Sequence, residues 1–187
     1  MFTRSRLSKL ADSSLDPHQR KILSDIANGP RGNLDGPFLA WIHSPKLADH
    51  AQQLGAFCRY ETRLETRLSE LAILTTAALW HSQAEWMIHY PIGLRSELTE
   101  NVLNSLRAGE QPVFVKRDEA LIHRFVTELY ATRRVHASLY NEAVELLSEA
   151  GVVELTGLLG YYSLVAMTLN VFAVAPDDDV ACLPFPA

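Results

Sequence analysis

Two carboxylates and a histidine are spaced so that they can perform acid–base chemistry. The segment HSQAEWMIH, residues 81–89, directly follows the apolar run LAILTTAALW, residues 71–80. It contains Glu85 and His89, which lie four residues apart and therefore share one face of a helix. Glu70, on the preceding helix, has mostly apolar helical neighbours. A histidine beside partly buried carboxylates can move protons at neutral pH, so these three side chains are the candidate catalytic residues.

The same segment allows two further interpretations. Ser82 and Glu85 form the S-x-x-E pattern of a capping box, in which case His81 precedes the helix. If the helix begins earlier, His81, Glu85 and His89 lie within an arc of about 80° and can bind a metal, with Glu70 as a fourth ligand. The spacing matches neither H-E-x-x-H nor the E-x-x-H of di-iron bundles, so we expect no metal site.

Residues near the segment are candidates for binding a substrate. Trp80 and Trp86 flank it and can line a pocket, although aromatic residues more often belong to the core. Arg59, Arg63 or Arg67 can hold a substrate carboxylate through a forked, bidentate contact. The ordinary alternative is that the arginines are solvated surface charges, and that Arg67 pairs within its helix with the carboxylate three residues on.

Helix signals follow one another along the whole chain, and no segment alternates as a strand does. Capping boxes are predicted at Asp16 and Thr62, and the apolar positions Leu47, Ala51 and Leu54 share one face of a helix. The sequence therefore predicts an all-α fold, with helices over residues 17–27, 37–43, 45–58, 62–80, 82–91, 99–106, 116–132, 138–150 and 152–175.

Composition excludes several classes of protein. The chain has 187 residues, which suits one domain, and its net charge of −5 argues against nucleic acid as a partner. Cys58 and Cys182 form no CxxC motif, so we expect reduced thiols. The basic N-terminus lacks an apolar stretch, which indicates no signal peptide and a cytoplasmic protein. Residues 152–175 are long enough to cross a membrane, but their polar residues and the absence of a positive flank favour a core or subunit-interface helix.

The order of Glu70, Ser82, Glu85 and His89 resembles the active-site frame of the carboxymuconolactone decarboxylase and alkylhydroperoxidase-D-like superfamily. In its thiol branch, a Glu is followed after eleven residues by C-x-x-C-x-x-x-H. Here Glu70 and His89 match that pattern, whereas Ser82 and Glu85 occupy the two cysteine positions. The similarity extends over residues 36–173. The resemblance implies an alkylhydroperoxidase-D-like helical bundle that assembles into homo-oligomers, either trimers or hexamers.

The resemblance also suggests an activity. Without the two cysteines, thiol peroxidase chemistry is disfavoured, and acid–base chemistry remains. We expect a cofactor-independent lyase of the decarboxylase type, or a related proton-transfer enzyme, that acts on a small lactone or unsaturated carboxylic acid. A metal-dependent enzyme and a non-catalytic ligand-binding oligomer are the alternatives. The expected catalytic residues are Glu70, Glu85 and His89, and the expected substrate-binding residues are Trp80, His81, Ser82 and Trp86.

The predicted organisation has three parts. Residues 1–35 form an N-terminal helical extension and loop, residues 36–175 form the carboxymuconolactone decarboxylase-like helical domain, and residues 176–187 form a C-terminal tail. The expected partners are a small-molecule substrate and further copies of the chain, without nucleic acid or membrane. No metal or organic cofactor is required by the expected chemistry.

Overall fold

The structure, a computed structural model, describes residue 2, residues 4–176 and residue 185. Throughout this part of the chain the regular elements are helical, apart from one isolated β-bridge between Arg4 and Ala175. The prediction of an all-α fold is therefore confirmed. The elements are a 3-10 turn η1 (Asp12–Ser14) and the helices α1 (Pro17–Asn28), α2 (Phe38–Trp41), α3 (Pro45–Tyr60), α4 (Thr66–Leu79), α5 (Gln83–Arg95), α6 (Glu100–Ala108), α7 (Arg117–Thr132) and α8 (Ala137–Val171).

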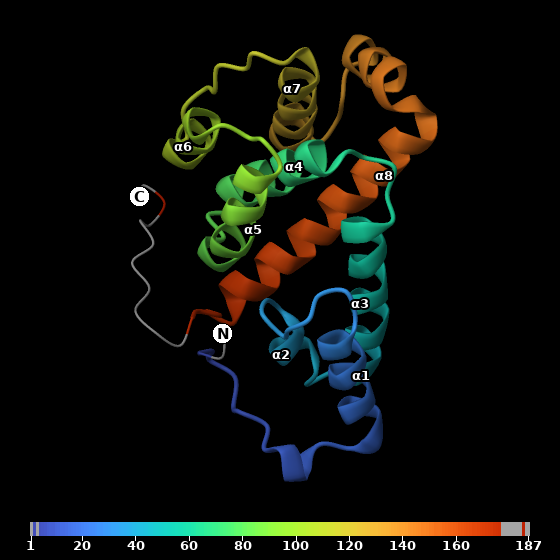
Figure 1. Ribbon diagram of the computed structural model, residues 1–187, viewed down its shortest axis with the longest axis vertical. Coiled ribbons are helices and arrows are strands. Elements are labelled where there is room, and N and C mark those ends of the chain that lie inside the picture. The colour runs from blue at the N-terminus through green and yellow to red at the C-terminus, as the bar shows by residue number, and fades with distance from the viewer. Residues whose placement is uncertain (1, 3, 177–184, 186–187) are drawn as a thin grey trace.

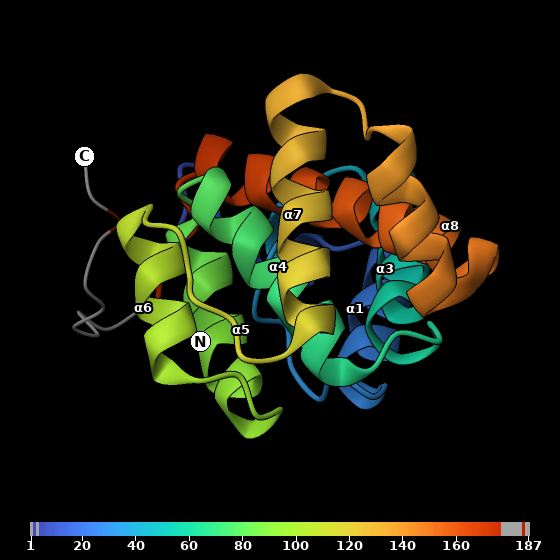
Figure 2. The same cartoon turned by 90° about the horizontal axis from the view of Figure 1, so that it is seen from above.

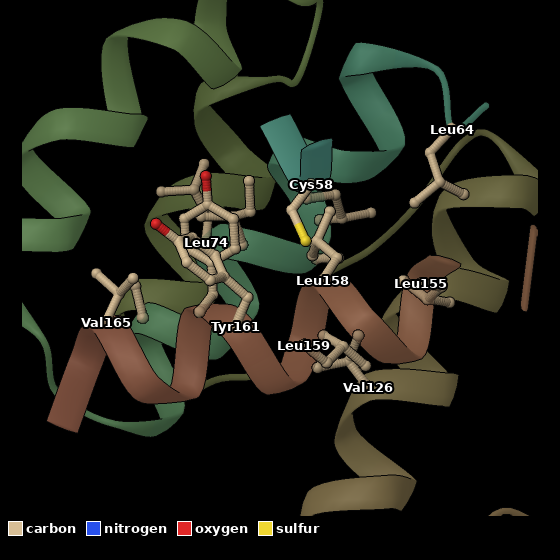
Figure 3. Packing of buried hydrophobic residues seen from close by; sticks show 14 of the residues in the cluster. Cys58, Leu64, Leu74, Val126, Leu155, Leu158, Leu159, Tyr161 and Val165 are labelled. Carbon is tan, nitrogen blue, oxygen red and sulfur yellow. The ribbon is translucent and has the colours of Figure 1, made fainter. Parts of the chain in front are cut away.

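Helix α8 crosses the molecule and organises the core. It runs diagonally in Figure 1, with α4 and α5 on one side and α3 on the other. Figure 2 shows α7 lying against α4, with α6 beside α5. Leu155, Leu158 and Leu159 lie along the middle of α8 with Cys58 of α3 above them (Figure 3), and all four are almost completely buried. Burial of apolar surface around α8 is thus the main stabilising contribution.

The N-terminal segment folds back onto the end of α8. Beyond the Arg4–Ala175 bridge, the Arg6 backbone N–H donates to the Phe172 carbonyl, and the Phe2 N–H donates to the Asp35 carboxylate. Helix α1 packs on α3 (Figure 1). The predicted domain boundary near residue 35 stays a prediction, but the segment before it is in contact with the helical body.

The predicted start of α1 and both ends of α6 show clear capping interactions. Asp16 and Gln19 form both hydrogen bonds of a capping box at the start of α1. Thr99 accepts from the Val102 N–H at the start of α6, and Gly109 ends that helix in the left-handed conformation.

The predicted capping box at Thr62 is wrong, because α4 begins only at Thr66, after Glu65. The residues before α4 are held instead by a distant contact. The Arg63 backbone N–H donates to the Glu154 carboxylate at 2.7 Å, and the Arg63 side chain pairs with the same carboxylate at 3.1 Å. The Glu154 carboxylate of α8 thus accepts a backbone N–H from the segment before α4, where a capping box would have used a side chain three residues away.

Two predicted interruptions behave differently in the structure. We predicted that the fifth helix ends near Pro91, yet α5 continues to Arg95 with the proline inside it. Close packing at Gly93 accompanies this extension of α5 beyond Pro91. A Cβ at Gly93 would lie 2.8 Å from the Leu74 side chain of α4, so the last turn of α5 is packed directly against α4. The predicted break at Gly151 is replaced by a kink at Ser148, whose φ is 66°, and the chain on both sides forms α8.

The buried face of α3 also differs from the predicted one. Ala48, Ala51 and Gly55 face inward, whereas Leu47 and Leu54 are exposed. Small residues thus allow α3 to approach α8 closely. By length and composition α8 could cross a membrane, but 56% of its most apolar window is buried within the chain, as in the core helix of a soluble protein.

Candidate functional site

Glu70 and His89 form a buried pair between α4 and α5. His89 Nδ1 lies 2.8 Å from Glu70 Oε2, and both side chains are nearly inaccessible to solvent. The carboxylate orients the imidazole through one ring nitrogen and leaves the other nitrogen available. The ring edge of His89 also packs against Tyr162 of α8, with 5.1 Å between centroids. Helices α4, α5 and α8 together hold the histidine in one orientation.

Glu85 is a buried carboxyl group, and neither of its oxygens has a hydrogen-bond partner among the described residues. Its residue is 1% exposed and lies in the first turn of α5. Burial raises the pKa of Glu85 well above its usual range; the Ser82 hydroxyl opposes this shift without forming an aligned hydrogen bond, and the Glu70 carboxylate adds to it. Glu85 is therefore a protonated acid over much of the pH range in which ordinary glutamates are ionised.

Glu85 and His89 line the same small cavity. It encloses about 20 Å³ at the junction of α5, α8, α3 and the loop after α1. A cavity of this size holds about one water molecule or a small polar group. Tyr161 and Tyr162 form part of the wall from α8. Burial raises the pKa of Tyr161 to about 12 and also raises the pKa of Tyr162 well above its usual value, so both are hydroxyl donors at neutral pH. The other charged residues of the wall are Arg31, Asp35 and Arg59.

The expected substrate-binding residues do not line this cavity. His81 precedes α5 with a φ of 48°, is exposed, and stacks on Phe185. It therefore lies off the face shared by Glu85 and His89, and a three-residue ladder on one helix does not form. Trp86 is buried and packs against Tyr90 and Phe185.

Ser82 and Trp80 have unsatisfied polar atoms instead. Ser82 is the N-cap residue of α5, but its hydroxyl makes no cap hydrogen bond, so the capping box with Glu85 is not formed. The indole N–H of Trp80 is buried and likewise has no partner in the described structure. Trp80 is the C-cap residue of α4, two residues before Ser82 in the connection to α5.

Two of the three arginines considered for carboxylate binding are occupied elsewhere. Arg67 does not pair with Glu70; it binds Asp118 at 2.6 Å and Glu119 at 2.7 Å on α7. Arg63 pairs with Glu154. Arg59 is the member of this group that lines the cavity.

Cysteine chemistry and metal binding find no support among the described residues. Cys58 is buried, and burial raises the pKa of its thiol to about 11, which is unsuited to a reactive thiolate. Cys182 and most of the predicted tail lie outside the described residues. Within the described part, no group of three or more His, Cys, Asp or Glu side chains is placed to hold a metal ion. The set of His81, Glu85, His89 and Glu70 is not assembled because His81 lies elsewhere.

The arrangement of helices matches that of a solved protein. A crystal structure of an alkylhydroperoxidase AhpD core, an uncharacterized peroxidase-related protein from Ralstonia eutropha JMP134, is similar with a TM-score of 0.75. The match covers 94% of this chain and 93% of that chain at 15% sequence identity. This chain has the alkylhydroperoxidase-D-like fold. No protein-family model and no curated protein sequence matches it. The expected fold is confirmed, and decarboxylase-type chemistry stays a prediction.

The alkylhydroperoxidase-D-like fold brings in residues that sequence patterns assign no place in the site. Arg31 lies in a Gly-, Pro- and Asn-rich loop, and its type and spacing carry no signal for a site formed by α5 and α8. Tyr161 and Tyr162 stand out in the sequence only as polar groups within an apolar run. Their consecutive positions place them about 100° apart on α8, so both can reach one cavity.

Proposed function

We propose that this protein is a cofactor-independent proton-transfer enzyme, of the decarboxylase or lyase type, that uses Glu85 and His89. The observation that supports this proposal is the 2.8 Å pair of His89 with Glu70 beside the unpartnered, protonated carboxyl group of Glu85. An oriented imidazole and a carboxyl group of raised pKa are the components of general acid–base catalysis. Glu70 is the positioning residue for His89.

The reaction that fits these groups is loss of CO₂ from an unsaturated acid or lactone acid. The bond between the carboxylate and its carbon breaks, and its electron pair delocalises into the conjugated carbonyl as a dienolate. A proton then returns to the remote carbon, so that one CO₂ leaves and one proton is gained. The acids that can supply this proton are Glu85 and protonated His89. The same groups can serve isomerisation or another proton transfer beside a carbonyl.

The test is a screen of small lactones and unsaturated carboxylic acids for CO₂ release and for isomerisation. With an accepted substrate, Glu85→Gln and His89→Ala are each expected to lower kcat by about 10²–10⁴-fold. Because His89→Ala leaves a buried charge at Glu70, His89→Ala with Glu70→Gln is the matched variant for folding. Circular dichroism should show native helix content in every variant. Full turnover by correctly folded Glu85→Gln and His89→Ala proteins contradicts the proposal.

We further propose that the chain forms homo-oligomers, trimers or hexamers, through the outer face of α8. Val153 is 70% exposed, and Met167 and Val171 on the same helix are also exposed. A Cβ added at Gly157 or Gly160 would meet nothing within 4 Å, so this face is open and smooth. Apolar surface of this kind on a long helix is typical of a contact between copies.

The oligomeric state can be measured by light scattering after size-exclusion chromatography. Val153→Glu combined with Met167→Lys is expected to shift the wild-type oligomer toward monomer, because charges would be buried at the contact. Val113→Glu is the control, since Val113 is 86% exposed in the connection between α6 and α7. A monomeric wild type, or a double variant with the wild-type mass, contradicts this proposal.

A further inference from the structure

We infer that Arg31, assisted by Arg59, binds a carboxylate group of the ligand at the Glu85–His89 cavity. The inference that this ligand is a substrate rests on the proposed function, whereas carboxylate binding by Arg31 does not. It narrows the substrate class to carboxylic acids, because a neutral lactone has no negative charge to pair with the two arginines. It also makes the N-terminal segment part of the site.

Arg31 is held in place while part of its hydrogen-bonding capacity is unused. Its guanidinium carbon lies 4.9 Å from the centroid of the Phe38 ring and 5.9 Å from that of Tyr60. Stacking on aromatic rings fixes the plane of a guanidinium without using its N–H donors. Among the described residues, the buried Arg31 Nη2 atom makes no aligned hydrogen bond, although the Tyr161 hydroxyl lies nearby. A buried unpaired donor of a charged group is costly, so this atom is expected to meet an acceptor when the ligand binds.

Gly55 shows how closely the site is built around this arginine. A Cβ at position 55 would overlap the Tyr161 hydroxyl and come within 2.7 Å of Arg31 Nη2. The absent side chain on α3 therefore provides the space in which the guanidinium and the phenol meet. The Tyr161 oxygen can accept from the guanidinium, which opposes the rise of the Tyr161 pKa, while the hydroxyl hydrogen stays available to donate. The place where the two groups meet therefore presents N–H and O–H donors and suits an acceptor such as a carboxylate oxygen.

The charges around the cavity favour an anion. Arg31 and Arg59 both line it, and neither forms an ion pair with any residue that the structure describes. Arg59 lies over the Tyr60 ring at 5.5 Å. The opposing charge is Asp35, whose carboxylate already accepts the Phe2 N–H. Two arginines against the one carboxylate of Asp35 favour an anion, and the raised pKa of Glu85 lessens the opposing charge of that residue.

The size of the cavity agrees with a carboxylate rather than a whole ring. About 20 Å³ is enclosed, which accommodates about one water-sized group, such as a carboxylate oxygen, but not a lactone ring. The acidic end of a ligand can therefore enter between the arginines, while its body remains toward the mouth of the cavity. In that position the ligand carboxylate lies beside Glu85 and His89, which line the same space.

The inference can be tested with acetate and its neutral counterpart acetamide. Thermal unfolding of the full chain at pH 7 and constant ionic strength yields an apparent Kd for each compound, because binding to the native state raises Tm. Wild type is expected to show saturable stabilisation by acetate and none by acetamide. Arg31→Met is expected to weaken acetate binding at least about tenfold, and Arg31→Lys is expected to be intermediate, since lysine keeps the charge without the fork.

Two further variants separate charge at the cavity from charge elsewhere. Asp35→Asn is expected to tighten acetate binding, because it removes the opposing carboxylate. Arg134→Met, at an exposed arginine after α7, is expected to leave binding unchanged. If Arg31→Met does not fold, the weaker acetate binding expected of Arg31→Lys still tests the inference. Equal acetate binding by wild type and the Arg31 variants, equal effects of acetate and acetamide, or no saturable effect in wild type would each overturn the inference.

The outcome is distinguishable from failure of the proposed function. Glu70→Gln removes the carboxylate that orients His89 and lies outside the lining of the cavity, so it is expected to lower turnover and to keep Arg31-dependent acetate binding. Loss of turnover in that variant with unchanged acetate binding in Arg31→Met overturns the arginine assignment alone. Arg31-dependent acetate binding without turnover of any acid in the screen leaves the assignment standing and contradicts the enzymatic proposal.

Discussion

Two buried polar regions of this molecule differ in whether their hydrogen bonds are complete. Around Arg67, every charge has a partner: the guanidinium binds Asp118 and Glu119, and the Asp118 carboxylate also accepts the Glu119 N–H. Around Glu85 and Arg31, three buried atoms of ionisable side chains make no aligned hydrogen bond with any described residue. The first region joins α4 to α7, which is a structural task. The second keeps unpaired groups beside a cavity, where a ligand can pair with them.

The largest effect on stability is expected from breaking the paired region. Arg67→Met would leave Glu119 buried without its closest partner, and Asp118 would also lose its main contact. Removing one member of a buried ion pair typically lowers the free energy of unfolding by about 3–5 kcal/mol. Urea denaturation measures the change. Adding Asp118→Asn and Glu119→Gln to Arg67→Met should recover much of the loss; a loss below about 1 kcal/mol for Arg67→Met would contradict the structural assignment.

A smaller loss is expected where the cavity wall is tightest. Gly55→Ala places a methyl group against Tyr161 and Arg31, and overpacking of this kind lowers stability by about 1–3 kcal/mol. Tyr161→Phe removes the hydroxyl that the new methyl group would overlap. The double variant is therefore expected to be less destabilised than the sum of the two single variants, measured by urea denaturation. If the two losses of unfolding free energy simply add in the double variant, the new methyl group and the Tyr161 hydroxyl do not compete for the same space.

A further effect has the opposite sign and depends on pH. Because burial raises the pKa of Glu85 above its unfolded value, the native chain holds a proton that the unfolded chain releases. The free energy of unfolding therefore falls as pH rises above about 4.5, by at most about 1.4 kcal/mol per pH unit, until the native group also ionises. Glu85→Gln removes this loss, so its stability advantage over wild type should grow from pH 4.5 to pH 7.5.

Urea denaturation at the two pH values checks this prediction, with Glu149→Gln as the control at an exposed position. A Glu85→Gln advantage that is independent of pH would show that Glu85 ionises normally in the native chain. If Glu85→Gln raises the free energy of unfolding at pH 7.5 and also lowers turnover, Glu85 serves the reaction at a cost in stability. Arg67 is the contrast, since its removal is expected to lower stability without touching the cavity.

Local signals predicted the parts of the fold that depend on neighbouring residues. The capping box of Asp16 and Gln19, the Thr99 cap and the Gly109 end are interactions over three or four residues. Such signals misplace the start of α4, because Glu154, which lies far along the chain, holds the segment before Thr66. They also misplace the interruptions in α5 and α8, where packing against neighbouring helices outweighs the local preference.

The sequence by itself determined the helical fold class and the spacing that places Glu70, Glu85 and His89 on adjacent helices. A period of 3.6 residues puts Glu85 and His89 on one face, and this requires no knowledge of the rest of the chain. Only the tertiary structure decided that Glu70 meets His89 rather than Arg67, and that Arg31 reaches the cavity while His81 does not. Those choices depend on which helices pack together and on where α5 begins, and contacts between distant segments carry no periodic signal in the sequence.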